Sequence, residues 1–202
     1  MRAGRGDDAV MARILVAYTG WKGQTERIAL RIAQLLRAQG HDVSQLASPA
    51  ALARSLLDRD AVVIGGGVRY GRHARALERA VRENAEFLAA FPNAFFSVSM
   101  SASRPGGLAQ ARAYADAFFA RTRWQPRTTA LFAGSLAYTG YPAWMRWMMR
   151  FISSRSGNAT DTSRDHEYTD WDAVERFARD FAASLAPPRT RGVEPVAVHV
   201  ET

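Results

Sequence analysis

The chain has 202 residues, and its 27 Lys and Arg against 19 Asp and Glu give a formal net charge of +8. Hydrophobic residues make up 48% and charged residues 23%, a composition typical of a globular protein with a sizeable core. No cysteine is present, which excludes disulfides, cysteine-ligated metals and thiol nucleophiles. The chain has neither a run of about 18 apolar residues nor an apolar signal at its start, so we expect a cytoplasmic protein.

In chain order, residues 1–11 are predicted as a disordered extension. The apolar run at 13–18 ends near Gly20 and predicts a buried strand. Apolar residues at helical spacing then predict a helix over 24–39, which Gly40 ends as a C-cap. A weak alternation predicts an edge strand at 41–46, and a short helix follows at 49–57.

The second part of the chain repeats this alternation. A buried strand is predicted at 61–64, followed by a glycine loop at 65–67. The remaining expected elements are a helix at 72–90, a strand at 94–98, a helix at 108–121, a strand at 128–133 and a final helix at 171–185 capped by Thr169 or Asp170. Residues 187–202 are rich in proline and predicted as a loose tail.

Apolar strands that alternate with helices favour an α/β fold, a doubly wound sheet of five parallel strands with ligands at the carboxyl ends of the strands. The prediction is one folded domain over 12–186. An unusually long connection, the insertion at 135–168, separates the last strand from the last helix, and such long connections are usually functional. We expect this inserted segment to be helical in part.

The first strand runs into a loop that suits a phosphate group. Seven consecutive residues combine glycines, hydroxyls, one lysine and the start of a helix, namely Thr19, Gly20, Trp21, Lys22, Gly23, Gln24 and Thr25. Backbone N–H groups and the positive end of the helix bind anions there. The loop has neither a Walker A motif nor a dinucleotide fingerprint, so a mononucleotide phosphate is the better candidate ligand. The alternative is a plain turn between strand and helix that binds nothing, which the concentration of glycines and hydroxyls disfavours.

The pattern from Tyr18 through Gly23 and Thr25 to Ala29 resembles the phosphate loop of flavodoxins, which bind FMN, although Gly20 stands where that family usually has Ser or Thr. The match narrows with the stretches 62–71, 96–98, 160–162 and 168–171. Together they resemble the flavodoxin-like menaquinone-dependent protoporphyrinogen IX dehydrogenase family of haem biosynthesis, over about residues 13–185. The resemblance implies a flavodoxin-like fold and FMN as cofactor.

By this resemblance, two further loops flank the flavin ring, and in such enzymes the flavin itself does the hydride chemistry. The first carries Gly66, Gly67, Val68, Arg69 and Tyr70, and the second carries Ser97, Val98, Ser99 and Met100. Tyr70 either stacks on the ring or caps the sheet. Arg69 is the one catalytic candidate, because it could bind a substrate carboxylate or stabilise a reduced, anionic flavin. The alternative is a solvated surface residue.

The insertion contains a basic aromatic segment at 142–152, whose helical wheel places Trp144, Trp147, Met148 and Phe151 on one side and Arg146 and Arg150 on the other. Such a helix can lie at a membrane interface, roof an apolar substrate pocket, or pack in a core or oligomer contact. No metal-ligand spacing is found, and His73, His166 and His199 are interpreted as solvated or capping residues.

The first hypothesis is an FMN enzyme that oxidises protoporphyrinogen IX and passes the electrons to a membrane quinone, menaquinone or ubiquinone, at the cytoplasmic face of the inner membrane. The alternatives are a flavodoxin-type electron carrier, which the +8 charge disfavours, and an NAD(P)H:quinone reductase. Nucleic-acid binding is not favoured, because no recognition motif accompanies the charge. The sequence is compatible with either a monomer or a homo-oligomer.

Overall fold

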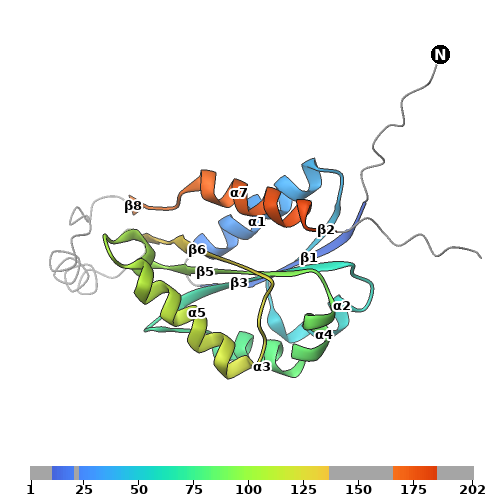
Figure 1. Ribbon diagram of the computed structural model, residues 1–202, viewed down its shortest axis with the longest axis horizontal. Helices are drawn as coiled ribbons and strands as arrows, with labels where there is room; N and C mark the ends of the chain where they lie inside the picture. The colour runs from blue at the N-terminus through green and yellow to red at the C-terminus, as the bar shows by residue number, and fades with distance from the viewer. Residues whose placement is uncertain (1–10, 21–22, 137–165, 186–202) are drawn as a thin grey trace, which may run out of the picture.

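A computed structural model gives the fold and describes residues 11–20, 23–136 and 166–185 (Figure 1). Its centre is a parallel sheet in the order β2-β1-β3-β5-β6, which confirms the predicted five-stranded doubly wound topology. The strands are β1 (Arg13–Thr19), β2 (Asp42–Leu46), β3 (Ala61–Arg69), β5 (Asn93–Ser99) and β6 (Thr128–Ala133).

Helices cover both faces of this sheet (Figure 1). One face carries the first and last helices, α1 (Gln24–Ala38) and α7 (Trp171–Ala183). The other carries α2 (Leu52–Leu56) after a 3-10 turn at Pro49–Ala51, α3 (Arg75–Glu83), α4 (Ala85–Ala90) and α5 (Leu108–Thr122). A second 3-10 turn at Met100–Ser103 connects β5 toward α5.

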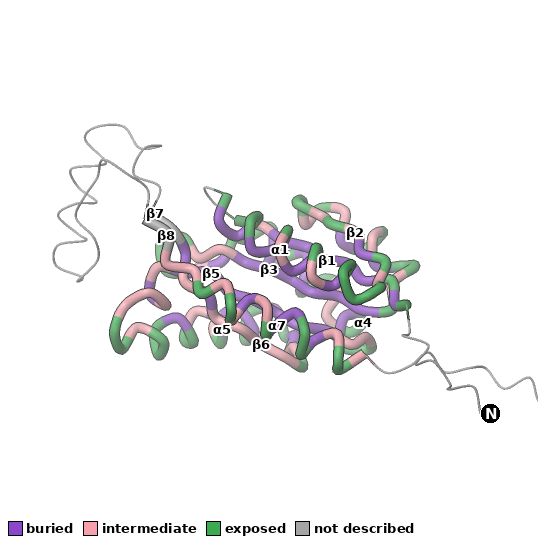
Figure 2. The backbone as a smooth tube through the Cα atoms, turned by 90° about the horizontal axis from the view of Figure 1, so that it is seen from above, coloured by how far each residue is buried: buried purple, intermediate pink, exposed green. Residues whose placement is uncertain are grey.

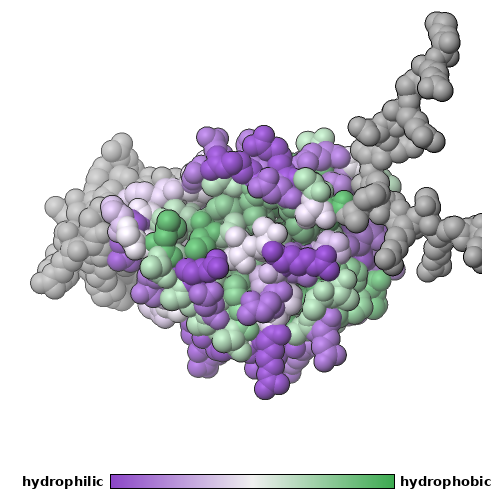
Figure 3. Space-filling model, viewed as in Figure 1, coloured by the Kyte–Doolittle hydropathy of each residue, from purple (hydrophilic) through white to green (hydrophobic). Residues whose placement is uncertain are grey.

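Side-chain alternation along the strands divides the core into two layers. In β1, Ile14 and Val16 pack under α1 and α7, whereas Leu15 and Ala17 face the opposite helices. Both layers are buried, and the three central strands β1, β3 and β5 are mostly purple in Figure 2, whereas the edge strands β2 and β6 are only partly buried. This explains why the strands appear as continuous apolar runs in the sequence. Hydrophilic side chains cover much of the outer surface of α1 and α7 (Figure 3).

The single helix predicted at 72–90 is wrong. Arg72–His73 form a short strand, β4, that pairs antiparallel with the end of β3. The helical remainder then breaks at Asn84, where the side-chain Nδ2 donates to the carbonyl of Ala80 at 2.8 Å. A side chain that bonds the backbone in this way competes with helix continuation.

The predicted glycine loop at 65–67 is also wrong, because these residues continue β3: Gly65 and Gly66 pair with both β1 and β5, and Gly67 pairs with β5. Packing explains their identity. A Cβ on Gly65 would overlap the ring of Phe96, and one on Gly66 would lie 2.6 Å from the ring of His73. Glycine inside a strand thus marks a close approach rather than a turn.

The two ends of the insertion meet as a small antiparallel pair, β7 (Ser135–Leu136) and β8 (His166–Glu167). The segment between them, including the predicted helix at 142–152, lies outside the described residues. After β8, Asp170 caps α7 by accepting a hydrogen bond from the Ala173 N–H at 3.0 Å, as one of the two predicted caps.

Candidate functional site at the carboxyl edge of the sheet

The predicted site residues come from three neighbouring strands that end at one edge. Thr19 of β1 is in register with Gly66 of β3, which is in register with Ser97 of β5. In a doubly wound sheet this edge is where ligands bind, at the point where strand order reverses between β1 and β3. The backbone therefore brings the three predicted segments together, although they are far apart in sequence.

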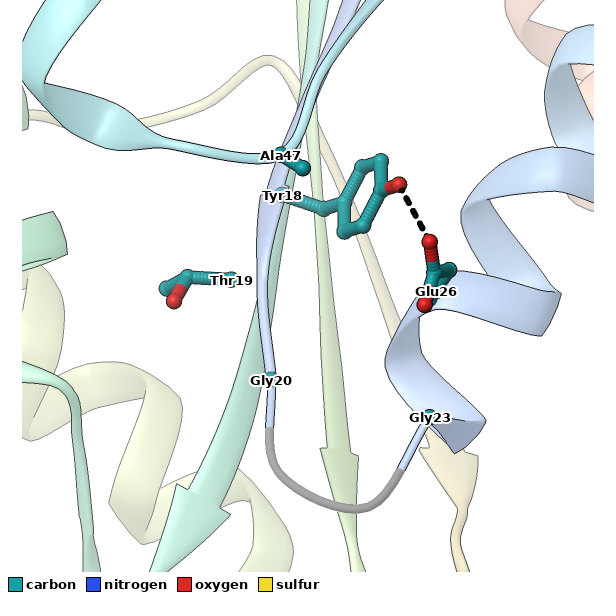
Figure 4. A pocket seen from close by; sticks show the side chains of 6 residues that line it. All are labelled: Tyr18, Thr19, Gly20, Gly23, Glu26 and Ala47. Atoms are coloured by element: carbon teal, nitrogen blue, oxygen red, sulfur yellow. Dashed lines mark hydrogen bonds between the residues drawn. The ribbon is translucent and has the colours of Figure 1, made fainter.

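A hollow of about 160 Å³ opens beside the loop between β1 and α1 (Figure 4). Its wall consists of Tyr18, Thr19, Gly20, Gly23, Glu26 and Ala47. The N-cap of α1 is Gly23, which has no side chain to satisfy the first-turn N–H groups. Such donors and the positive end of a helix favour an anion, so the phosphate loop expected from the sequence stays a prediction.

The Tyr18 side chain points toward α1, while that of Thr19 points to the other side of β1 (Figure 4). The Tyr18 hydroxyl donates to Glu26 Oε1 at 3.0 Å. Burial and the Glu26 carboxylate raise the pKa of the Tyr18 phenol, so it stays protonated and keeps donating. This bond holds the Glu26 carboxylate, in the first turn of α1, against β1.

Gly20, the departure from the flavodoxin pattern, has a packing reason. A Cβ at this position would overlap the side chain of Thr25, which is buried in the first turn of α1. The Thr25 side chain therefore occupies the space into which a Gly20 side chain would grow. Trp21 and Lys22 lie outside the described residues.

A hydrogen-bonded chain links the loop to the far end of the sequence. The buried Gln24 donates through Nε2 to the hydroxyl of Thr169 at 2.7 Å, and that hydroxyl donates to the carbonyl of Ala133 at 2.8 Å. Sequence reasoning considered Thr169 only as a helix cap. Gln24 and Thr169 are 145 positions apart in the sequence, so no local signal reports this contact.

Arg69 and Tyr70 stand at the tip of the β3–β4 hairpin. Tyr70 and Gly71 both have positive φ, 50° and 77°, as a two-residue type I′ turn requires. Tyr70 is 86% exposed, and the Arg69 guanidinium lies 4.9 Å from the centre of its ring. The tip thus projects an aromatic and a cation beyond the sheet edge, whereas Gly66, Gly67 and Val68 lie within the strand.

The predicted site residues at the end of β5 differ in burial and hydrogen bonding. Val98 is buried toward α7, and Met100 begins the 3-10 turn. The Ser97 hydroxyl lies 3.1 Å from His73 Nε2, so its side chain is engaged inside the protein. The Ser99 hydroxyl is buried and has no hydrogen-bond partner among the residues that the structure describes, which makes it a candidate to bind a ligand at this edge.

His73 is not the solvated or capping residue that the sequence suggested. It is 1% exposed and packs edge-on against Phe95 and Phe118. Burial, outweighing the nearby Glu78 carboxylate, lowers its pKa to about 4, so the imidazole is neutral near pH 7. His166 and His199, and the aromatic segment with Trp144, Arg146, Trp147, Met148, Arg150 and Phe151, have no described side chains.

Comparison with known proteins agrees with this geometry. The flavodoxin domain model matches residues 15–163. The protoporphyrinogen IX dehydrogenase [quinone] of Escherichia coli K12 is 34% identical over 176 residues, covering 84% of this chain and 94% of the relative. The protein of the same name from Leishmania major is 37% identical over 139 residues, covering 67% of this chain and 60% of the relative.

Among solved structures, oxidised flavodoxin 2 from Bacillus cereus superposes with a TM-score of 0.53 at 20% identity, covering 85% of this chain and 99% of the flavodoxin. This likeness shows the fold. Flavodoxin-domain membership indicates FMN as the cofactor, as the sequence predicted. The chain belongs to the flavodoxin family, in the branch that includes the quinone-linked protoporphyrinogen IX dehydrogenases.

Proposed function

We propose that this protein uses FMN to oxidise protoporphyrinogen IX to protoporphyrin IX and passes the electrons to a membrane quinone. The observation that carries the proposal is the 34% identity to the Escherichia coli dehydrogenase over 94% of that enzyme. The edge described above supports it, since an anion loop and an aromatic–cation tip stand at the ends of adjacent strands. FMN, when bound, supplies the hydride acceptor.

The described residues fit such a cofactor. The backbone of the loop from Thr19 to Thr25, with no side-chain cap at Gly23, would hold the phosphate. The segments 66–70 and 97–100 would flank the ring, and the buried, unpartnered hydroxyl of Ser99 supplies a polar group at that edge. Arg69 would bind a carboxylate of the porphyrinogen by charge-assisted hydrogen bonds.

The purified protein tests this directly. We expect the absorption spectrum of bound flavin, and then porphyrin fluorescence when protoporphyrinogen and a quinone are added. Flavin-loaded protein that never forms porphyrin would contradict the proposed activity. Reduction only by a flavodoxin reductase would indicate an electron carrier instead, and rapid flavin bleaching by NADPH would indicate an NAD(P)H:quinone reductase.

The proposed quinone lies in the bilayer, so we further propose that the basic aromatic segment at 142–152 binds the anionic surface of the inner membrane. Within the described residues no helix has the length and apolarity needed to cross a membrane.

We expect the double variant Arg146→Glu and Arg150→Glu to lose binding to anionic vesicles. The control changes two exposed arginines elsewhere, Arg75→Glu and Arg179→Glu, and should keep it. Undiminished binding by the first variant would refute the membrane role.

A further inference from the structure

A buried carboxylate joins the β3–β4 hairpin to two helices. Glu78 of α3 has a side chain only 9% exposed. Its Oε2 accepts from Arg72 of β4 at 2.7 Å, and its Oε1 accepts from Arg121 of α5 at 2.9 and 3.0 Å. One acidic side chain therefore bonds two arginines from two other elements. The proposed phosphate, flavin and substrate contacts do not involve Glu78, Arg72 or Arg121.

The hairpin itself contains a charge conflict that this carboxylate relieves. Arg72 stands directly opposite Arg69 in the β3–β4 register. Like charges placed opposite each other on antiparallel strands destabilise the pair. Glu78 draws the Arg72 head to the α3 side, while the Arg69 head lies over the Tyr70 ring. The two cations are thereby directed to different partners.

His73, the second residue of β4, anchors the base of the hairpin in the core, whereas the turn at the tip is exposed. Tyr70 takes a left-handed conformation that is uncommon for a bulky residue and is itself 86% exposed. A Cβ on Gly71 would lie 3.8 Å from the Tyr114 ring of α5, so the turn passes close to that helix. Arg72 is the residue that follows the turn, and its bond to Glu78 fixes the hairpin where it leaves the tip.

We propose that Glu78 is a positioning residue, which holds the β3–β4 hairpin so that Arg69 and Tyr70 face the substrate at the sheet edge. The inference rests on the proposed function for the identity of that substrate. Glu78 does not touch the substrate, and it acts by binding Arg72 against α3 and α5. Without its charge, Arg72 loses its partner and again opposes Arg69.

Hydrogen exchange tests the structural part without any turnover. We expect Glu78→Gln to raise amide exchange in residues 68–73 by about tenfold or more, because the hairpin opens locally. The matched control is Glu83→Gln on the same helix, whose exposed ion pair with Arg79 involves no hairpin residue. In an Arg69→Gln background, where no like charge opposes position 72, Arg72→Gln removes only the contact with Glu78, and Glu78 keeps Arg121. Adding Arg72→Gln to Arg69→Gln must therefore raise the same exchange even if Glu78→Gln does not fold. Unchanged hairpin exchange on that addition would overturn the proposal.

A double-mutant cycle on the FMN-loaded enzyme tests the positioning role. We expect Glu78→Gln to raise KM for protoporphyrinogen about tenfold with kcat changed by less than about twofold, because ground-state and transition-state binding are lost alike. In an Arg69→Gln background the same change should alter KM by less than about twofold, because coupled residues are not additive. Fully additive effects would show a general structural role and overturn the proposal. Failure of the wild-type protein to turn over protoporphyrinogen would instead overturn the proposed function, and the exchange result would stand separately.

Discussion

At the scale of single residues, His73 couples the fold most directly to pH. Its imidazole is enclosed by Phe95, Phe118 and the Gly66 backbone, with Ser97 as its polar contact. Burial is the main cause of its low pKa, with Arg121 adding to it and Glu78 opposing it. Since the ordinary value is 6.5 and the folded value is about 4, the unfolded chain takes up this proton first.

The free energy of unfolding should therefore fall as pH drops from 6.5 to 4, by up to about 3 kcal/mol from this one group. We expect His73→Gln, which cannot titrate, to remove most of that slope in denaturant titrations run at several pH values. His41→Gln is the control. Burial also lowers the pKa of His41, but this side chain is less enclosed, so its replacement should remove less of the slope. The pKa of Asp60 is lowered by its hydrogen bond from Arg13, so Asp60 reduces the free energy of unfolding only as the pH falls below its ordinary pKa of 3.8. An unaltered slope in His73→Gln would contradict this account.

At the scale of elements, the contact between β3 and β5 depends on the absence of side chains. The Phe96 ring lies where a Gly65 side chain would stand, and it also packs near Phe132 and Phe177. The ring therefore joins two strands and α7 in one layer of the core. A larger residue at position 65 must displace it.

We predict that Gly65→Ala lowers the free energy of unfolding by about 1–3 kcal/mol through overpacking. Adding Phe96→Leu should recover part of that loss, because the smaller side chain vacates the space. Gly134→Ala is the matched control, since its Cβ would meet Met100 Sδ at 3.5 Å, an ordinary contact. Chemical denaturation measures all of these variants, and a strictly additive double variant would show that the two positions do not compete for space.

These two scales show what the sequence could and could not predict. Buried parallel strands form continuous apolar runs, so β1, β5 and β6 were found to within a residue or two. The β3 extension was missed because glycine usually signals a loop, whereas here Phe96 and His73 require it. The position of the β1–α1 loop at the sheet edge follows from local sequence, and its role in binding phosphate stays a prediction. The contacts of Thr169 with Gln24 and of Glu78 with Arg121 depend on tertiary packing, and no local pattern reports them.

At the scale of the whole molecule, the two ends of the fold meet at the proposed cofactor site. Helix α7 packs on α1, and Arg31 of α1 pairs with Glu175 of α7. The Thr169 hydroxyl then connects the start of α1 to the end of β6. The loop that we propose to hold the phosphate thus depends on a residue that follows the insertion.

We expect Thr169→Val to raise the Kd for FMN about tenfold, because Gln24 and the Ala133 carbonyl lose the partner that connects them. Quenching of flavin fluorescence on titration measures this. The control is Thr122→Val, a fully buried threonine whose hydroxyl donates to the Phe118 and Phe119 carbonyls of its own helix. That variant should lose stability without a change in FMN affinity. Equal FMN affinity in both variants would argue against the connection.

The position of α7 has a consequence for how the protein is made. Val174, Phe177 and Phe181 of α7 are part of one core layer, where Phe177 packs on Phe96 of β5 and Phe132 of β6, yet α7 is the last helix that the structure describes. During synthesis the ribosome releases every strand of the sheet before it releases this cover. Of the helices described here, a nascent chain that ends at β6 therefore has α1 alone over that apolar face. Burial of this face is completed only when α7 has left the ribosome.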